Sequence, residues 1–426
     1  MGKGIWQDFA WVEQANSEVL KIFHPSDEYA ALRPAAAPKI EVTHLAKGRY
    51  TVAVGWHDTF QPYQAQVVTY GTDNVRCKFG EFAEPTYVGR VGTTLNLSDW
   101  KSRMYVKCVD ADGNLVDSRF VFSFSGRAVS ATHKLRGPAA YFETTMEGEV
   151  TSNYVEVVEG AANGPFDGVR LSYCRDPLNF GLMTPDPGFP GGAVPNPDDF
   201  VSTGLYKEGA GFMSYNSSPD NPLPEIRRTS TGIYDVRLPG LGTPNPGLVQ
   251  VTAIGSGSAH CVAGLPIASS PGSDLRVRVE GWRESKRVNT GFVLNYDEGV
   301  TRYQLHQGAR VYADNWLEAS YTPARSDNTG TFVDAPGTNT AYRIGTGRYR
   351  VHHTNLRVKP NSVWAGAAPA FELLGIAAPG GSYCKVEKWV PKSTGTDVYI
   401  RCYDAEGKLA DSRYYETYQG HELRAT

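Results

Sequence analysis

The chain carries one sequence pattern three times, and this internal repeat constrains its fold more than any other feature. Each copy opens with a glycine, one further residue and a tyrosine, followed by alternating apolar and polar side chains; the copies lie at residues 48–54, 232–238 and 347–351. A glycine followed by period-two alternation is typical of a turn that opens a half-buried β-strand. Self-similarity of this kind indicates a repeated structural unit, so we expect three tandem copies of one module.

Further segments recur in the same order around this Gly-Tyr strand. The middle copy departs from the other two, because it carries Val279 where they carry Cys108 and Cys402 and because its closing hairpin is shortened. The recurring segments are an opening strand (10–13, 140–143, 311–314), an apolar strand (66–71, 249–255 and, more loosely, 371–375), a cysteine strand (75–78, 260–262, 383–386), a following strand (104–110, 275–280, 398–404) and a closing hairpin (110–120, 289–292, 404–414).

The spacing of the repeat locates an insertion in the middle copy. Gly48 and Gly232 are 184 residues apart, whereas Gly232 and Gly347 are 115 apart, which leaves an excess of 69 residues. The excess lies between the opening strand of the middle copy and its Gly-Tyr strand. We therefore expect a first β-module at residues 5–126, a second at 138–308 with an insertion at about 149–209, and a third at 309–420.

The residue content indicates an all-β fold. The 426 residues include 24 Tyr, 17 Phe, 45 Gly and 27 Pro, which favour strands and turns over helices. About seven or eight short strands in roughly a hundred residues suit three tandem antiparallel modules of the β-sandwich or jelly-roll type, or small barrels. The pattern is also compatible with packing around a pseudo-threefold axis, which would imitate a homotrimer within one chain.

The six cysteines follow the repeat, which predicts disulfides between equivalent strands. The alternative is that all six are buried free thiols, which are common in protein cores. Disulfides would place the protein in an oxidising compartment, either secreted or at the cell surface. The predicted pairs are Cys77–Cys108, Cys384–Cys402 and, as a candidate third pair across the insertion, Cys174–Cys261.

Charge and hydropathy exclude several classes of protein. A net charge of −3 and a pI near 6.3 argue against a general nucleic-acid-binding surface, which would be basic. The sequence contains no apolar run of about eighteen residues, so we expect no membrane span. Residues 1–6 lack the apolar stretch of a signal peptide, so we expect either another export route or a leader that this sequence does not include.

Side chains with catalytic or metal-binding chemistry do not form a recognisable site in the sequence. His352 and His353 are adjacent on a strand and must face opposite sides, so we interpret them as a surface-and-core pair. Ser258 lies near His260, but proximity in sequence does not make a catalytic triad. The aspartates around Gly113 fit a hairpin turn better than a calcium loop. We expect no catalytic residue, no metal ion and no cofactor.

The insertion is the strongest candidate for a ligand site. Its Pro- and Gly-rich middle, residues 184–197, cannot form regular structure, and long loops in compact chains are usually functional or linkers. Aromatic rings stack on the apolar faces of sugars while carboxylates and amides bind their hydroxyl groups, so this composition suits a glycan. The alternative is that the rings pin the insertion to its own module. The candidate ligand-binding residues are Tyr154, Phe166, Tyr173, Phe189, Asp198, Asp199, Phe200 and Tyr206.

The combination of segments resembles known proteins. The Gly-x-Tyr-x-Val strand, the Val-x-Val-Thr-x-x-Gly strand, the cysteine strand and the closing Asp-Ser-Arg-Phe hairpin resemble tandem repeats in uncharacterised secreted proteins of filamentous bacteria. More remotely, residues 344–351 are similar to the strand openings of phage tail-fibre tip domains and of the C1q-like jelly roll. The first resemblance implies no particular function, and the second suits a component of an assembly.

These features lead to one principal hypothesis and two alternatives. Repetition without a catalytic constellation, paired cysteines and many aromatic residues indicate a secreted, non-enzymatic binding or structural protein that recognises carbohydrate or a cell surface. The first alternative is a hydrolase with its site in the insertion, where Asp198 and Asp199 form a possible carboxylate pair. The second alternative is a self-assembling fibre or appendage subunit.

Overall fold

The computed structural model of this chain consists of β-strands. It describes residues 7–12, 22–23, 41–55, 63–79, 101–126, 139–143, 201–202, 215–216, 224–243, 247–254, 257–297, 306–328, 331–332, 335–356, 360–367 and 380–421. Every regular element in these segments is a strand, which confirms the predicted all-β class. The same segments hold no apolar helix of membrane-spanning length.

One three-stranded arrangement occurs in each sequence repeat. The opening strand pairs with the closing strand, and the closing strand pairs with the apolar strand, always antiparallel. The strands are β1 (Gln7–Val12), β8 (Phe120–Gly126) and β5 (Tyr63–Thr69) in the first repeat, β9 (Ala139–Glu143), β19 (Gly291–Asp297) and β14 (Leu248–Ile254) in the second, and β20 (His306–Ala313), β30 (Tyr414–His421) and β27 (Pro360–Ala367) in the third.

A second, four-stranded arrangement also recurs. In each repeat the Gly-Tyr strand lies between its preceding strand and the strand that pairs with the cysteine strand. In pairing order the strands are β3 (Glu41–Ala46), β4 (Arg49–Gly55), β7 (Lys101–Val109) and β6 (Arg76–Phe79); β12 (Glu225–Ser230), β13 (Ile233–Leu238), β17 (Leu275–Arg283) and β15 (His260–Ala263); and β25 (Asn339–Gly345), β26 (Arg348–Thr354), β29 (Gly395–Tyr403) and β28 (Tyr383–Lys392).

Short strands extend the edges of these sheets or form small hairpins. The predicted boundary between the second and third modules, at residues 308 and 309, falls inside β20. The short strands are β2 (Ile22–Phe23), β10 (Val201–Ser202), β11 (Tyr215–Asn216), β16 (Ile267–Ala268), β18 (Lys286–Arg287), β21 (Ser320–Tyr321), β22 (Arg325–Asn328), β23 (Thr331–Phe332) and β24 (Ala335–Pro336).

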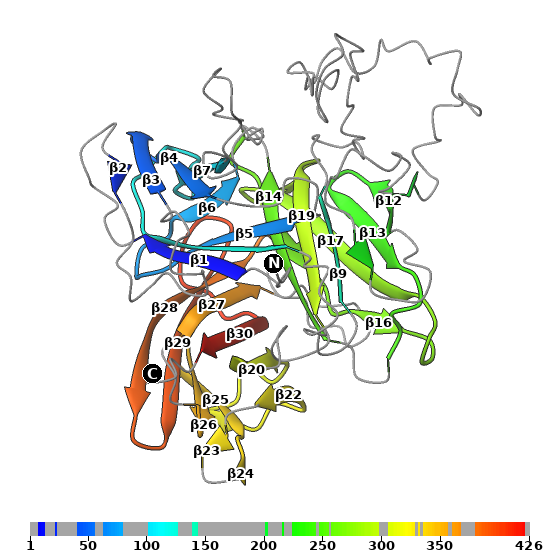
Figure 1. Cartoon of the computed structure of the whole chain (residues 1–426), viewed down its shortest axis with the longest axis vertical. Helices are drawn as coiled ribbons and strands as arrows, with labels where there is room; N and C mark the ends of the chain where they lie inside the picture. Colours follow the sequence, from blue (N-terminus) through cyan, green and yellow to red (C-terminus); the bar gives the residue numbers. More distant parts are fainter. Residues whose placement is uncertain are drawn as a thin grey trace, which may run out of the picture.

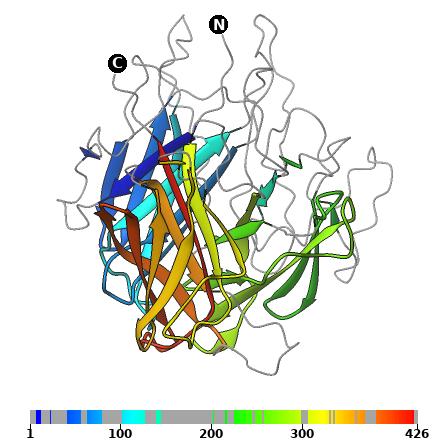
Figure 2. The ribbon, with the colours of Figure 1, turned by 90° about the horizontal axis from the view of Figure 1, so that it is seen from below.

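Each repeat buries apolar side chains from both of its arrangements in a common core. In the first repeat, Tyr50 and Val106 from the four-stranded arrangement pack in one cluster with Phe120 and Phe122 from β8. Corresponding clusters form in the second and third repeats. Figure 1 shows the strands of the three repeats, coloured blue to cyan, green, and yellow to red, as three groups around a common centre. Figure 2 shows the third group beside the first.

The Gly-x-Tyr motif forms a hydrogen-bonded latch that closes each repeat. In the third repeat, Asp411 accepts hydrogen bonds from the Gly347 N–H at 2.9 Å and from the Tyr349 hydroxyl at 3.1 Å. The same hydroxyl accepts a hydrogen bond from the Ser412 N–H at 3.0 Å. Gly347 adopts a φ of +61°, a conformation in which a β-carbon would be strained. The motif therefore joins the start of β26 to the segment that leads into β30.

The latch recurs in the other two repeats. In the first repeat, Asp117 accepts hydrogen bonds from the Gly48 N–H at 2.6 Å and the Tyr50 hydroxyl at 3.2 Å. In the second repeat, Asn289 accepts a hydrogen bond from the Gly232 N–H at 2.8 Å, and the Tyr234 hydroxyl accepts one from the Thr290 N–H at 3.0 Å. The hairpin that differs most in sequence thus keeps the contact to the glycine N–H and the contact to the tyrosine hydroxyl oxygen.

Strand register corrects one position of the predicted alignment. Cys108 pairs with Cys77 and Cys402 with Cys384, but the residue opposite Cys261 is Gly281. The prediction that Val279 replaces the second cysteine was therefore wrong by two residues, because a shift of two leaves the apolar alternation of a strand unchanged. The middle hairpin is also one residue shorter than the other two. A β-carbon on Gly281 would lie 2.5 Å from the Val288 carbonyl oxygen, so the shorter hairpin leaves no room for a cysteine.

Two of the predicted disulfides are present. Cys77 bonds to Cys108 and Cys384 to Cys402, and each bond joins neighbouring antiparallel strands. Cys261 forms no disulfide with another described cysteine. Its predicted partner Cys174 lies outside the described residues, so that third pair stays a prediction.

Candidate functional site at the junction of the repeats

The three repeats meet where the loop before each cysteine strand contacts the next repeat. The loop of the first repeat, residues 71–75, lies against the third. The Gly71 N–H donates to the Val386 carbonyl at 3.0 Å, and the Tyr403 hydroxyl donates to the Thr72 carbonyl at 2.9 Å. Tyr70 also forms a parallel bridge with Val386. Backbone groups of the loop take part in each of these contacts, so together they fix the position of the loop.

Equivalent loops connect the other pairs of repeats. In the second repeat, Ile254 pairs in parallel with Phe79 of the first, and Lys107 donates to the Gly257 carbonyl at 3.5 Å. In the third repeat, Gly380 packs against the Trp282 ring of the second so closely that a β-carbon would lie 2.6 Å from it. The first repeat therefore contacts the third, the third contacts the second and the second contacts the first.

A chain of hydrogen bonds passes through all three repeats at this junction. Arg76 on β6 donates from Nη1 to His260 Nδ1 on β15 at 3.0 Å. Because Nδ1 accepts, His260 Nε2 carries the proton, and it donates to the Gly381 carbonyl of the third repeat at 2.9 Å. Tyr383 on β28 completes the chain, since its hydroxyl donates to the Asn74 carbonyl at 2.5 Å and its ring lies 4.8 Å below the Arg76 guanidinium.

Arg76, His260 and Tyr383 occupy the same position in the repeat, directly before the cysteine of each cysteine strand. The three equivalent positions therefore carry three different side chains, and these side chains fit one another. A symmetric trimer of identical chains would place three copies of one residue at this point. The single chain allows a donor, an acceptor and an aromatic ring to meet there instead.

Burial sets the protonation of the groups at the junction. Burial, together with the nearby charge of Arg76, holds the pKa of His260 well below its ordinary value of 6.5, so the imidazole is neutral. Burial raises the pKa of the Cys261 thiol to about 12, so this thiol stays protonated and is a poor nucleophile. Burial also lowers the pKa of Lys385, an effect that Asp73 opposes.

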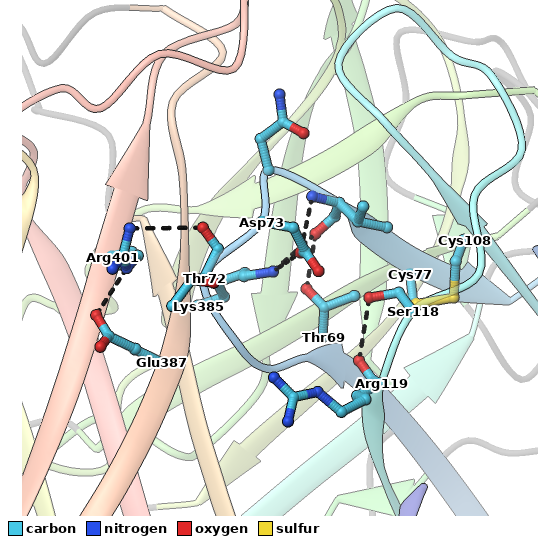
Figure 3. A network of polar contacts seen from close by, with 12 residues as sticks. Thr69, Thr72, Asp73, Cys77, Cys108, Ser118, Arg119, Lys385, Glu387 and Arg401 are labelled. Carbon is cyan, nitrogen blue, oxygen red and sulfur yellow. Dashed lines mark hydrogen bonds and ion pairs between the residues drawn. A yellow bond between two sulfur atoms is a disulfide. The ribbon is translucent and has the colours of Figure 1, made fainter. Parts of the chain in front are cut away.

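A cavity of about 70 Å³ lies between the three cysteine strands. Its lining includes cationic, neutral and aromatic side chains from all three repeats. Lys385 on its wall forms an ion pair with Asp73 on the loop of the first repeat, and Figure 3 shows this pair beside the pair of Arg401 with Glu387. The residues whose chemistry matters here are Arg76, Lys78, His260, Cys261, Tyr383 and Lys385.

The adjacent histidines of β26 face opposite sides, as the sequence predicts. His353 is fully buried, with Nδ1 at 2.8 Å from Asn339 Oδ1 and Nε2 at 3.1 Å from Glu416 Oε2. His352 is partly exposed, and its Nδ1 lies 2.7 Å from Asp397 Oδ1. The surface-and-core interpretation of this pair is confirmed.

His352 belongs to a small polar cluster at one end of the third repeat. Its Nε2 lies 3.4 Å from the exposed Thr394 hydroxyl, which gives a Thr-His-Asp order of contacts. The Asp397 carboxylate is shared with Arg350 at 3.7 Å and Lys392 at 3.9 Å. A carboxylate shared among three cationic or basic groups at a hairpin is typical of a surface ion-pair network, so we assign no catalytic role to it.

The aspartates of the closing hairpins stabilise turns. Asp110 accepts a hydrogen bond from the Asn114 N–H at 2.8 Å, and Asp404 accepts the equivalent bond from the Lys408 N–H at 2.8 Å. Nowhere in the described part of the chain do three or more His, Cys, Asp or Glu side chains group as a metal site would. The turn interpretation of these hairpins agrees with the hydrogen bonds.

All eight residues predicted to bind a ligand lie outside the described residues. They are Tyr154, Phe166, Tyr173, Phe189, Asp198, Asp199, Phe200 and Tyr206. The junction residues, in contrast, were missed as a group, although the sequence offers a signal for them. In an otherwise similar strand, the position before the cysteine differs most in chemistry between the copies, which is expected where copies contact one another.

Comparisons of this chain with protein-family models, with curated proteins and with solved structures found no match.

Proposed function

We propose that the protein is a non-enzymatic binding or structural protein that works outside the cell, secreted or at the cell surface, and that its three repeats are β-modules held as one body. The observation that carries this proposal is the hydrogen-bonded chain from Arg76 through His260 to Gly381, which joins all three repeats. A rigid body of this kind suits a protein that presents a surface to a partner.

The disulfides support an extracellular setting. Each joins two strands of one sheet, and such bonds persist in oxidising compartments and are rare in the cytosol. On the chain-entropy relation, loops of this length stabilise a module by about 3–4 kcal/mol. That gain matters most for a protein that works without chaperones.

The partner that we propose is a glycan or another cell-surface ligand, bound by the insertion of the middle repeat. The support is the composition of the insertion, whose aromatic, Asp and Asn residues suit sugar recognition. In the sequence, the insertion follows β9 and precedes β11 and β12. β11 pairs with β9 of the three-stranded arrangement, whereas β12 is part of the four-stranded arrangement of the second repeat. The described strands before and after the insertion therefore both belong to the second repeat.

A glycan array followed by isothermal titration calorimetry with the full chain tests this function. Binding that is lost when residues 149–209 are replaced by a short Gly-Ser linker would support it, and the His352→Ala variant serves as a control that leaves the insertion intact. Hydrolysis of generic ester or glycoside substrates that is abolished by Asp198→Ala or Asp199→Ala would overturn the non-enzymatic proposal and favour the hydrolase alternative. Absence of glycan binding at millimolar ligand would reject the sugar partner.

An assembly role is the second candidate. The junction favours it, because three equivalent strands meet there as the subunits of a trimeric fibre tip would. Light scattering at increasing protein concentration tests this candidate directly. Growth of the mean mass with concentration would support a self-assembling subunit, and a constant monomer mass would reject it.

A further inference from the structure

The cavity at the junction is lined by positive charge. Arg76, Lys78 and Lys385 all line it, and they are exposed by only 7%, 3% and 1%. No described Asp or Glu is part of the lining. Three buried cations around one cavity are costly unless negative charge compensates them.

Arg76 carries the least compensated of these charges. Its Nη1 donates to the neutral His260, and its Nη2 donates to the carbonyls of Asp110 at 3.2 Å and Ala111 at 3.4 Å. Its buried Nε–H has no hydrogen-bond acceptor among the described residues. The described partners of this guanidinium within hydrogen-bonding distance are therefore all neutral.

Carboxylates near the junction compensate only part of the charge. Asp73 forms an ion pair with Lys385 from the rim, where it is half-exposed. Asp110 and Glu284 act on Arg76 through space, without an ion pair to it in the described part of the chain. Because Asp73 is paired with Lys385, the cation of the lining that a bound anion would contact most directly is Arg76, whose Nε–H has no acceptor among the described residues.

We propose that this cavity binds a small inorganic anion, such as chloride or phosphate, between Arg76, Lys78 and Lys385. A volume of about 70 Å³ accommodates a monatomic or tetrahedral anion. The anion would accept the hydrogen bond of Arg76 Nε, which no described residue accepts. Because strands from all three repeats line the site, the anion would act as a common ligand that fastens the junction.

Thermal unfolding of the full chain in different anions tests this proposal. The melting temperature is measured at pH 7.5 with increasing sodium chloride or sodium phosphate, at an ionic strength held constant with sodium gluconate, whose anion is bulkier than chloride or phosphate. Binding to the folded state alone predicts a saturable rise of at least about 2 °C. The chloride and phosphate arms show which anion the cavity prefers.

Two variants and one control make the test specific. Lys78→Met removes a cation of the lining at similar volume, and Arg76→Lys keeps the charge but removes the Nε donor; both are expected to abolish the saturable rise. Lys286→Met removes an exposed charge and is expected to keep it. Should either lining variant fail to fold, anomalous diffraction from crystals of the unaltered protein soaked in bromide replaces it, with a peak in the cavity expected.

The melting temperatures distinguish binding of an anion in the cavity from a general effect of salt. A saturable rise that the Lys286→Met variant keeps and the lining variants lose supports the anion site. A rise that is linear in concentration and equal in all variants overturns it, because that behaviour belongs to general salt effects on protein surfaces. An empty cavity in bromide-soaked crystals would also overturn it.

Discussion

At the scale of single residues, two sets of hydrogen bonds between polar groups connect the described segments of the chain. One is the latch, in which an Asp or Asn side chain accepts the N–H of the turn glycine in every repeat. The other is the junction, where His260 accepts from Arg76 and donates to Gly381. Both sets of hydrogen bonds satisfy buried polar groups. Each such group, left without a partner, would lower the free energy of unfolding by about 1–3 kcal/mol.

Asp411 tests the latch. Burial alone would raise the pKa of this carboxyl, but hydrogen bonds from Arg343, Gly347 and Tyr349 hold it below its ordinary value. We expect Asp411→Ala to lower the free energy of unfolding by about 2–3 kcal/mol, because it leaves the glycine N–H and the tyrosine hydroxyl without their acceptor. Urea denaturation of the full chain measures this loss.

Asp411→Asn is the matched control for that variant. It recreates the side chain that the second repeat carries as Asn289, so it should keep the hydrogen bond from the Gly347 N–H. It loses only the partly exposed ion pair with Arg343, which is worth about 1 kcal/mol or less. Equal losses for the two variants would contradict the latch.

His260 makes the junction sensitive to acid. Its folded-state pKa lies well below the value of about 6.5 that the unfolded chain has. Below that pH the unfolded chain binds a proton that the folded chain excludes, so stability is full above about pH 6.5 and falls as the pH drops below it. The melting temperature of the protein should therefore decrease between pH 7 and pH 5.

His260→Gln should flatten this pH dependence, because an amide can accept from Arg76 and donate to Gly381 without titrating. The groups that face His260 are Arg76, Lys78 and Tyr383, none of which titrates ordinarily in this pH window. His352→Gln, at the partly exposed histidine, is the control that should keep the slope. A slope in His260→Gln equal to that of the unaltered protein would show that another group is responsible.

At the scale of strands, the sequence predicts the positions of strands and the pairing of cysteines, because these depend on side-chain alternation and on the repeat. Alternation after Gly48, Gly232 and Gly347 correctly places β4, β13 and β26, and repeat logic correctly pairs Cys77 with Cys108. The match of Val279 to Cys108 failed because a shift of two residues leaves an apolar alternation unchanged. Only the pairing register shows that Gly281 stands opposite Cys261.

The site could be predicted less well than the strands. The position before each cysteine is visible in the sequence, but contacts between residues 184 positions apart, such as Arg76 and His260, depend on how the repeats pack. Alternation in the sequence identifies the buried face of a strand, but it does not identify the repeat that packs against that face. The predicted ligand residues of the insertion, from Tyr154 to Tyr206, lie outside the described residues.

The disulfides provide a prediction at the strand scale. Replacing Cys77 and Cys108 together by alanine should lower the free energy of unfolding by about 3–4 kcal/mol, because the bond closes a loop of 31 residues in the unfolded chain. The pair Cys384 and Cys402 closes a loop of 18 residues and should contribute slightly less. Chemical denaturation of each double variant measures the losses.

The thiol count completes that test. Unfolded, unreduced protein is alkylated and weighed by mass spectrometry. The two disulfides leave only Cys174 and Cys261 to react, so no alkylation is expected if these two are bonded to each other. Four or more modified cysteines would contradict the two disulfides seen here.

At the scale of the whole molecule, the three repeats differ most where they meet. Equivalent positions carry Arg76, His260 and Tyr383, and their contacts need all three side chains at once. Three repeats joined in one chain can diverge in this way, whereas three identical subunits cannot. We therefore expect the modules to depend on one another and to behave as a single body.

Small-angle X-ray scattering of the full chain tests this central claim most directly. A single compact body of 426 residues has an expected radius of gyration of about 22 Å, whereas three separate modules strung in a line would exceed about 30 Å. We predict a value near the lower figure that stays constant with protein concentration. A value above the upper figure would show that the repeats are strung out, and it would contradict the junction.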